Sequence, residues 1–582
     1  EMMAPLRRRF GTSFDALVAH QVEVLAGDLS SETLGLDEAT LTRLRTDLDL
    51  VINSAGLVSF NPQLDQALES NAVGAELVAR FTRACDHAKL VHISTCFVAG
   101  ARSGRIREDA DVVGYFPKQS EMAGVSFDWR REVRDLRRLV EHVKSRTDDG
   151  ALEATFRRDA LARLEREGRE AHERTVRAAM TNQRRRWIAD EQIRLGKERA
   201  AHWGWPNIYT LTKALGEQAL ASTEGLDWAI VRPAIVESAA TYPFPGWNEG
   251  MNTSAPLAYL AREGQIVFPG TNDLILDVVP VDYVASATLA AGAALLEGES
   301  RRVYQVAAGD VNPCSMARTI SLVSIYRRRW VREQEATGQM PSWKAKFIER
   351  WRPVPTTRKQ YERFGAPAVE KWVSRARSVL DDLEPDRMGS FGEIVHRARS
   401  VTRDAENQLS KVTEVFDLFM PFIWENRYIF STRNTRGLFD RMSEADRALL
   451  PFDTEHLDWR QYWLDVHLPG LEKWVFPKLE FQGPSRVQIP RDYRDLAELF
   501  DTRTREHGRR TAYRIIKQDD VADHFSYREV RKAAFAVRSF LESRGVGRGD
   551  RVVLASEGCP EWGMSYFGII LAGATVVPVD TE

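Results

Sequence analysis

Short apolar runs alternate with longer amphipathic segments in the first part of the chain. Residues 22–30 (VEVLAGDLS) and 48–56 (LDLVINSAG) are apolar stretches closed by Gly, Asp or Asn, which is typical of buried parallel strands. Residues 89–100 (KLVHISTCFVAG) predict a third strand and residues 226–236 (LDWAIVRPAIV) a fourth. Residues 63–86 place their apolar side chains near one side of a helix. This alternation predicts an α/β fold built on a doubly wound parallel sheet.

Small and polar residues gather where these predicted strands end. Asp28, residues 53–56 (NSAG), Ser94 with Thr95, and residues 233–236 (PAIV) each lie at the end of an apolar run. In a parallel sheet the ligand sits beyond the carboxyl ends of the strands. We therefore expect these segments to line one crevice.

Residues 118–203 interrupt the alternation with helical, charge-dense sequence. One interpretation is an inserted pair of solvated helices that Glu–Arg pairs hold together. The other is that the excess of arginine meets an anionic partner, such as a phosphorylated carrier or lipid headgroups. The pattern favours the first interpretation, because charged runs are usually solvated faces.

The rest of the pattern divides the chain into segments of different character. Residues 1–309 hold the alternating strands and helices, including the insertion. Residues 310–475 are helical, rich in aromatic residues and poor in strand signals. Over residues 476–492 Pro and Gly recur and periodicity is lost, which predicts a linker. Residues 493–582 return to helices and strands, so we predict a second, smaller α/β domain there.

Composition excludes several classes of protein. The chain has 582 residues with 81 Lys and Arg against 83 Asp and Glu, so no global charge points to nucleic acid. The four cysteines are far apart and form no CxxC pair, which argues against a zinc site and a disulfide scaffold and suits a reducing cytoplasm. No leader is visible and the most apolar windows are too short to span a bilayer. We expect a cytoplasmic protein, and a peripheral membrane contact stays open.

One spacing carries specific chemistry: Tyr209 and Lys213 in GWPNIYTLTKALGE (204–217) lie one helical turn apart. An ammonium beside a phenol favours the ionised phenol, so the sequence predicts a lowered pKa for Tyr209. Such a phenol can exchange a proton with a carbonyl oxygen. A hydroxyl is needed to hold that oxygen, and Thr95, with Ser94 beside it, is the candidate. With a hydride source, the set would reduce a carbonyl.

These motifs resemble a known family. The strand-end Asp, NSAG, STCFVAG and the Tyr–Lys pair look like an extended short-chain dehydrogenase/reductase with a Rossmann-type sheet. More narrowly, GWPNIYTLTKALGE, VRPAIVESAATYPFPGWNEG and VHISTCFVAG resemble the fatty acyl-CoA reductases of the male-sterility type. PFDTEHLDWRQYWLDVHLPGLEKW is similar to the end of that family's helical C-terminal domain, so the resemblance covers about residues 8–475.

The resemblance implies reduction of a long-chain acyl-CoA by NADPH, usually through the aldehyde to a primary alcohol. It implies that Tyr209 donates the proton, that Lys213 holds the nicotinamide ribose, and that Thr95 binds the carbonyl oxygen. The remaining cofactor-binding positions it implies are Asp28 and Leu29 at the adenine, Ala55 and Gly56 along the cofactor, and Pro233 and Ile235 at the nicotinamide. Asn71 is either part of this site or only a helix residue that hydrogen-bonds between strands.

The sequence departs from the family at its start. The family's first strand and glycine-rich turn are absent, and residues 1–20 correspond to the helix before the third strand of the fold. Glu1 and the final GATVVPVDTE, which ends on a predicted strand, both indicate cut ends. The glycine turn places a helix N-terminus against the pyrophosphate. We therefore expect the chain as written to bind NADPH poorly, and the choice of NADPH over NADH rests on the resemblance.

Residues 525–580 resemble the start of an adenylate-forming enzyme of the acyl-CoA synthetase kind, with SYREV, GVGRGDRV, PEW and AGATVVPVD in order. In that family the ATP and Mg²⁺ sites come later than this opening subdomain, so we assign no catalytic residue here. The domain order suggests that one module activates a fatty acid and the other reduces the activated acyl group.

Three interpretations stay open from the sequence. The favoured one is a reductase of fatty acyl-CoA or an acyl-carrier thioester, with an acyl channel in residues 310–475. The candidate lining of that channel is Phe416, Phe419, Phe422, Trp424 and Phe430. The second is a sugar-nucleotide epimerase or steroid-type dehydrogenase of the same superfamily. The third is an inactive Rossmann shell that only binds. Chain length, end product and oligomeric state are not indicated.

Overall fold

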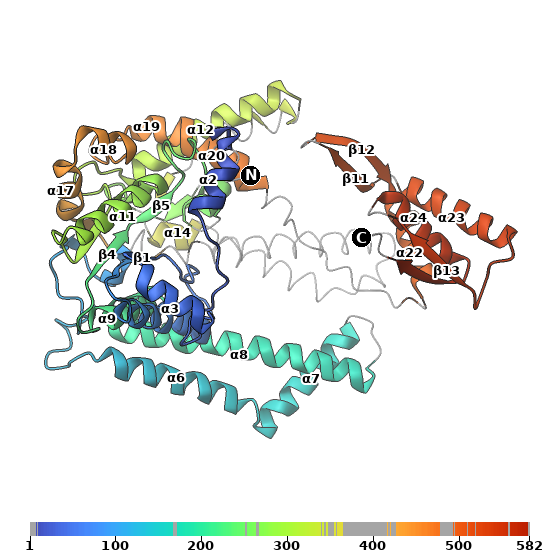
Figure 1. Ribbon diagram of the computed structural model, residues 1–582, viewed down its shortest axis with the longest axis horizontal. Helices are drawn as coiled ribbons and strands as arrows, with labels where there is room; N and C mark the ends of the chain where they lie inside the picture. Colours follow the sequence, from blue (N-terminus) through green and yellow to red (C-terminus); the bar gives the residue numbers. More distant parts are fainter. Residues whose placement is uncertain are drawn as a thin grey trace. The chain divides into compact units, whose positions relative to one another are not determined.

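The computed structural model divides the chain into two compact units, residues 1–483 and 484–582, which are described separately (Figure 1). The residues that it describes are 7–8, 10–166, 171–250, 253–263, 267–269, 271–338, 340–342, 345–346, 354–356, 358–364, 416, 420, 426–477, 493, 495–508, 510–517, 520–556 and 559–579.

A four-stranded parallel sheet lies at the centre of unit 1. Its strands are β1 (Leu50–Asn53), β2 (Lys89–Ile93), β4 (Trp228–Pro233) and β8 (Val303–Val306), in the order β1-β2-β4-β8. Every neighbouring pair is parallel. The strands β2, β4 and β8 are mostly buried, as expected for a parallel sheet, whereas β1 at the border is only partly buried.

Helices cover both faces of the sheet, which confirms the predicted doubly wound fold. On one face, α11 (Val281–Leu296) packs against the strands. On the other face lie α5 (Gly74–Arg83) and α9 (Ile208–Ala221). Successive strand residues alternate between these two cores: those facing α11 are Val91, Ala229, Val231 and Tyr304, and those facing α5 and α9 are Leu90, Ile230 and Val303.

One predicted strand is wrong. Residues 22–28 follow α2 (Ser13–Gln21) and precede α3 (Glu38–Asp47) as irregular chain, with Val24 89% exposed. An apolar run becomes a strand only if it can pair with a neighbour and bury one face. Among the described strands, β1 forms the border of the sheet on this side and pairs only with β2. The run therefore finds no strand to pair with.

The charged insertion forms three helices along one side of unit 1, namely α6 (Trp129–Arg146), α7 (Gly150–Arg166) and α8 (Glu173–Trp203) (Figure 1). Arg194 bonds both Glu191 and Glu198 on its own helix. Arg199 of α8 joins Glu132 of α6 in an ion pair with an N–O distance of 2.6 Å. The insertion therefore has three helices and not the predicted pair, while the Glu–Arg contacts fit the interpretation of solvated helices held together by ion pairs.

Side chains distant from β8 in sequence, Glu108 on one side and Asn434 and Thr435 on the other, complete the outer border of the sheet. The Gln305 N–H donates to Glu108 Oε1 (2.8 Å). Asn434 Nδ2 donates to the Val303 carbonyl (3.0 Å), and Thr435 Oγ1 donates to the Gln305 carbonyl (2.7 Å). Side chains thus satisfy backbone groups of β8 that a further strand would otherwise bond.

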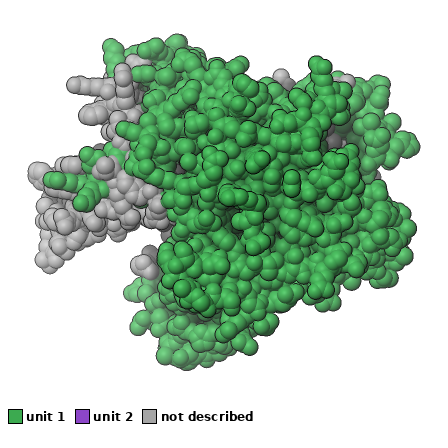
Figure 2. Space-filling view, turned by 90° about the vertical axis from the view of Figure 1, so that its left-hand side faces the viewer, with its two compact units in different colours: residues 1–483 green, residues 484–582 purple. Residues whose placement is uncertain are grey.

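The remaining elements of unit 1 surround this core (Figures 1 and 2). In chain order they are α4 (Leu64–Ala67), η1 (Leu68–Val73), η2 (Cys96–Ala99), β3 (Gly104–Ile106), β5 (Ile235–Glu237), α10 (Ala255–Glu263), β6 (Val267–Pro269), β7 (Val278–Pro280), α12 (Met316–Ala336), β9 (Val354–Thr356), α14 (Arg358–Phe364), β10 (Tyr428–Phe430), α17 (Arg433–Arg441), α18 (Glu444–Leu449), α19 (Trp459–Gln461), η6 (Tyr462–His467) and α20 (Leu468–Trp474). No helix in the described part of the chain combines the length and apolarity needed to cross a bilayer.

Unit 2 is a small α/β unit with its own core. It contains α22 (Leu496–His507), β11 (Thr511–Lys517), β12 (Asp520–Ser526), α23 (Tyr527–Ser543), β13 (Arg551–Ala555), α24 (Pro560–Leu571) and β14 (Thr575–Val579). β11 and β12 are antiparallel, whereas β13 and β14 are parallel. A capping box between Ser526 and Glu529 begins α23. Phe500, Val530 and Met564 are buried at its centre.

Candidate active site

Thr95 and Tyr209 meet at the carboxyl end of the sheet. Thr95 follows β2 and caps η2, while Asn207 caps α9 and so places Tyr209 in its first turn. Thr95 Oγ1 donates to the Pro233 carbonyl (3.4 Å), and the Thr95 hydroxyl lies near enough to the Tyr209 phenol to act on its pKa. This proximity would let the two hydroxyls approach one substrate oxygen.

Lys213 lies one turn further along α9 and is buried beside the loop that follows β1. Its Nζ donates to the Ile93 carbonyl (2.9 Å). A Cβ on Gly56 would lie 3.0 Å from Lys213 Nζ, and nearer still to Asn71 Oδ1. Only glycine lets the loop backbone approach the ammonium this closely. The structure thus brings Ala55 and Gly56 to Lys213.

Asn71 connects this loop to α9. Its Oδ1 accepts from the Leu57 N–H (2.8 Å), and its Nδ2 donates to the Leu57 carbonyl (3.0 Å) and to Thr212 Oγ1 (3.1 Å). Asn71 belongs to η1, a π-helical segment, and such segments occur often at functional sites. The side chain bridges a loop and a helix rather than two strands, and it holds Gly56 against Lys213.

Burial controls the pKa values of the pair. It raises the pKa of Tyr209 to about 12, although the neighbouring Thr95 hydroxyl acts in the opposite direction. It lowers the pKa of Lys213 to about 8, against the opposing effect of the Glu217 carboxylate. The predicted lowering of the phenol pKa is therefore wrong: the cost of ionising a buried phenol exceeds any help from the neighbouring ammonium. Tyr209 is a neutral acid at neutral pH.

Sequence reasoning missed His92 beneath this site. His92 Nδ1 and Asn53 Nδ2 are 3.1 Å apart, and Asn53 Oδ1 accepts from the Ala55 N–H (3.2 Å). Burial, and then the charge of Lys213, lower the pKa of His92 well below its usual range, so the imidazole is neutral. The available signal was a histidine inside the apolar run KLVHI. The pair fixes the loop that carries Ala55 and Gly56.

The other predicted cofactor residues fall into two groups. Pro233 contacts Thr95 through its carbonyl, and Ile235 follows it in β5, where its N–H donates to the Asp277 carbonyl. Asp28 is exposed in a turn, where it accepts from Ser30, and this lowers its pKa. Leu29 packs against the face of the sheet that carries α5. Among the described contacts, none joins Asp28 or Leu29 to Thr95, Tyr209 or Lys213.

The candidate lining of the acyl channel is only partly described. Phe416 and Phe430 are fully buried in two different core clusters. Phe419, Phe422 and Trp424 lie outside the described residues.

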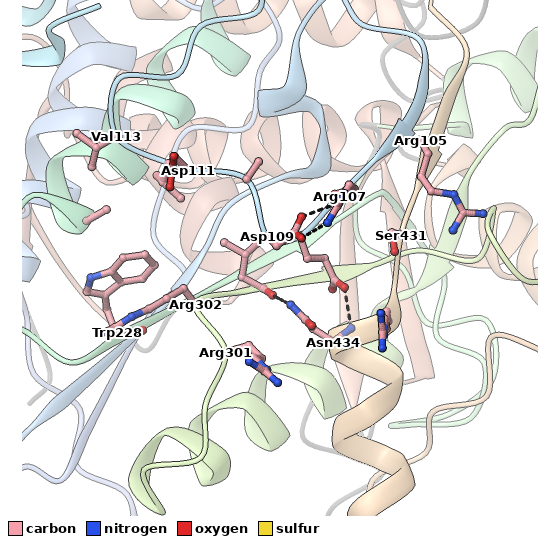
Figure 3. Close-up of a pocket in the computed structure, with 16 residues that line it drawn as sticks. Arg105, Arg107, Asp109, Asp111, Val113, Trp228, Arg301, Arg302, Ser431 and Asn434 are labelled. Carbon is pink, nitrogen blue, oxygen red and sulfur yellow. Dashed lines mark hydrogen bonds and ion pairs between the residues drawn. The ribbon is translucent and has the colours of Figure 1, made fainter.

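A wide polar hollow of about 1150 Å³ lies at the other end of the sheet, where β4 and β8 begin (Figure 3). Arg107 pairs with Asp109 there, and the Arg302 guanidinium lies over the Trp228 ring. None of the sequence-predicted site residues lines this hollow. Although the hollow is large, we therefore do not assign the reaction to it.

Comparison with known proteins places these features in a family. Two family models described as Male sterility protein match residues 6–288, as an NAD-binding domain, and residues 391–478. A third, described as AMP-binding enzyme, matches residues 500–582.

Several curated proteins are similar over most of the chain. Fatty acyl-CoA reductase 8 of Arabidopsis thaliana is 27% identical over 492 residues, which cover 82% of this chain and 87% of that protein. The alcohol-forming fatty acyl-CoA reductase of Simmondsia chinensis is 26% identical over 488 residues, with 82% and 86% covered. Human fatty acyl-CoA reductase 2 is 26% identical over 307 residues, with 51% and 53% covered.

These matches indicate an oxidoreductase that uses a nicotinamide cofactor and acts on fatty acyl groups. Residues 6–288 and 391–478 thus match the two Male sterility protein models, residues 500–582 match the AMP-binding enzyme model, and the chain as a whole is similar to fatty acyl-CoA reductases over most of its length.

Proposed function

We propose that the protein reduces a long-chain fatty acyl thioester with NADPH, through the aldehyde, to a primary alcohol. The observation that supports this most is the Thr95 hydroxyl beside the Tyr209 phenol, with Lys213 on the same helix as Tyr209, in a chain whose relatives are fatty acyl-CoA reductases. The relative from Simmondsia chinensis is named as alcohol-forming, which supports the end product.

The donor set at this site suits a nicotinamide cofactor and a carbonyl substrate. The Lys213 ammonium would bind the ribose hydroxyls, while Pro233 and Ile235 would pack against the nicotinamide. When bound, the reduced cofactor supplies a hydride. Asp28 and Leu29 would border the adenine, as the resemblance implies.

Thr95 and Tyr209 would act on the thioester carbonyl. Their hydroxyls would hold its oxygen, and Tyr209 would give its proton to that oxygen as the hydride adds to the carbonyl carbon. The raised pKa of Tyr209 suits this role, because the phenol keeps its proton until charge develops on the oxygen. Loss of the thiol leaves the aldehyde, and a second hydride and proton give the alcohol. Two reduced cofactors are consumed and one thiol is released.

The test is Tyr209→Phe in the natural protein. Loss of proton transfer should lower kcat by about a hundred- to ten-thousand-fold. Cofactor affinity should stay nearly unchanged, because Lys213 keeps its position. Tyr283→Phe removes a buried phenol from α11, outside the site, and is the matched control. A Tyr209→Phe enzyme that keeps half its rate would refute the assigned role.

The match of residues 500–582 to AMP-binding enzymes supports a second activity of the natural protein. It would activate a fatty acid with ATP and Mg²⁺ and so supply the acyl group that the reductase consumes. Formation of an acyl thioester from fatty acid, CoA and ATP tests this proposal, and unit 2 itself offers no candidate catalytic residue.

A further inference from the structure

We propose that a narrow apolar cavity of about 50 Å³ between α10, α12 and η6 receives the methyl end of the acyl chain and sets the longest chain accepted. The proposal rests on the proposed function, which supplies the acyl chain. Its walls include Ala258 and Ala261 of α10, Met316, Ile320 and Val323 of α12, and Trp463 of η6.

The lining suits hydrocarbon rather than water. Two hydroxyl side chains contribute to it, and both are engaged: Ser254 Oγ is 3.0 Å from His467 Nε2, and Thr319 Oγ1 is 3.4 Å from Cys314 Sγ. The lining residue Trp463 adds one buried donor, its indole Nε1, which has no hydrogen-bond partner among the described residues. A buried water needs two to four polar partners, whereas apolar cavities stay dry and accept apolar ligands. The methyl end of an alkyl chain is such an apolar ligand.

The cavity belongs to a core cluster that reaches the candidate active site. Phe60 and Ile235 pack against this cluster. The Phe60 carbonyl accepts from the Tyr209 N–H (3.2 Å), and the rings of Phe60 and Tyr209 meet edge to face. Ile235 lies two residues beyond Pro233, which contacts Thr95. Apolar side chains therefore extend from the reacting groups to the cavity.

His467 fixes the wall of the cavity to the strand that leaves the active site. Its Nδ1 is 2.9 Å from Ser238 Oγ, next to the end of β5, and its Nε2 bonds Ser254 at the start of α10. His467 is the last residue of the π-helical η6, which also carries Trp463. A wall held from both sides cannot yield to an extra methylene, which is what a chain-length limit requires.

The first experiment fills the cavity with Ala261→Leu and compares hexadecanoyl-CoA with octanoyl-CoA. Each methylene is worth about fourfold in binding, so we expect kcat/KM for the long thioester to fall by roughly tenfold or more. The short thioester should be reduced at nearly the wild-type rate. Ala317→Leu makes the same change on α12 away from the lining and should alter neither. An equal loss for both chain lengths would overturn the proposal.

A second measurement needs no turnover. Hexadecanol should raise the melting temperature of the wild-type protein but not that of Ala261→Leu, whereas octanol should act equally on both. If no thioester is reduced but hexadecanol still raises the melting temperature of the wild type alone, the proposed reaction is wrong and the proposed role of the cavity is supported. Equal stabilisation of both proteins by hexadecanol would refute the cavity as the site of the chain end.

Discussion

At the scale of single residues, two described contacts of the Lys213 ammonium bear on its function. It donates to the Ile93 carbonyl, and it lies against Gly56. Burial holds its pKa near 8, so its charge is lost at moderately alkaline pH. The charged ammonium is the form that can bind the hydroxyls of a ribose and stabilise negative charge on the oxygen of the bound carbonyl.

We therefore predict that cofactor affinity falls as the pH rises through about 8. Lys213→Met should bind the cofactor more weakly, react more slowly and lose this pH dependence. Titration of the reduced cofactor at a series of pH values measures both effects. If the affinity of Lys213→Met for the cofactor still fell near pH 8, the ionisation would belong to another group. The pH dependence of folding has the opposite sign from that of cofactor affinity. In the unfolded chain Lys213 keeps its proton up to a pKa of about 10.5, so the free energy of unfolding rises with pH between about 8 and 10.5.

How much of the site the sequence predicted also differs by residue. The spacing of Tyr209 and Lys213 and the strand-end position of Thr95 sufficed to predict that they lie together. The sign of the Tyr209 pKa shift did not follow, because a spacing reports the neighbouring charge but not the depth of burial. His92 was missed because a histidine in an apolar run gives no indication of what it bonds.

At the scale of elements, α9 and η1 pack with almost no space between them. A Cβ on Gly216 of α9 would lie 2.2 Å from the Asn71 carbonyl oxygen. Glycine at this position is therefore what allows the helix with Tyr209 and Lys213 to reach the segment with Asn71. The same contact sets the distance between α9 and the Gly56 loop, since Asn71 also holds Leu57.

Gly216→Ala should thus destabilise unit 1 by about 1–3 kcal/mol, because an overpacked backbone contact has to open. Gly437→Ala is the matched control: Gly437 lies in α17 and a Cβ there would meet no atom within 4 Å, so alanine should stabilise that helix by about 0.5–1 kcal/mol. Denaturant unfolding of the two variants measures the difference. A Gly216→Ala protein as stable as wild type would show that the two helices can move apart freely.

At the scale of the whole molecule, the border of the sheet at β1 is its most exposed part. β1 pairs with β2 alone among the described strands, and Ile52 at its centre is 40% exposed. Parallel sheets are normally covered on both faces, and a bare strand edge can pair with another chain.

Ile52→Lys should therefore reduce concentration-dependent self-association, because a charge on a border strand opposes pairing between chains. Leu449→Lys is the control. Leu449 lies on α18, which is not part of a sheet, and its side chain is more exposed than that of Ile52. Light scattering over a concentration series distinguishes them. Equal effects of the two changes would locate the association outside β1.

The same border explains where the fold prediction failed. The strands within 48–56, 89–100 and 226–236 could be predicted because each is a short apolar run, and each finds a parallel partner in the sheet. Residues 22–30 have an equally suitable pattern but no partner strand, and pairing cannot be read from a single run. β8 was not predicted, because its short VYQV run is completed by side chains far away in sequence.

Those distant side chains impose a time order on synthesis. The carbonyls of Val303 and Gln305 receive their hydrogen bonds from Asn434 and Thr435. A ribosome that adds roughly 5–20 residues each second makes these donors on the order of ten seconds after β8. During that interval the carbonyls of Val303 and Gln305 lack the donors that bind them in the folded protein. We expect the nascent chain to depend on chaperones during this interval, and a premature stop codon before residue 434 to leave a product prone to aggregation.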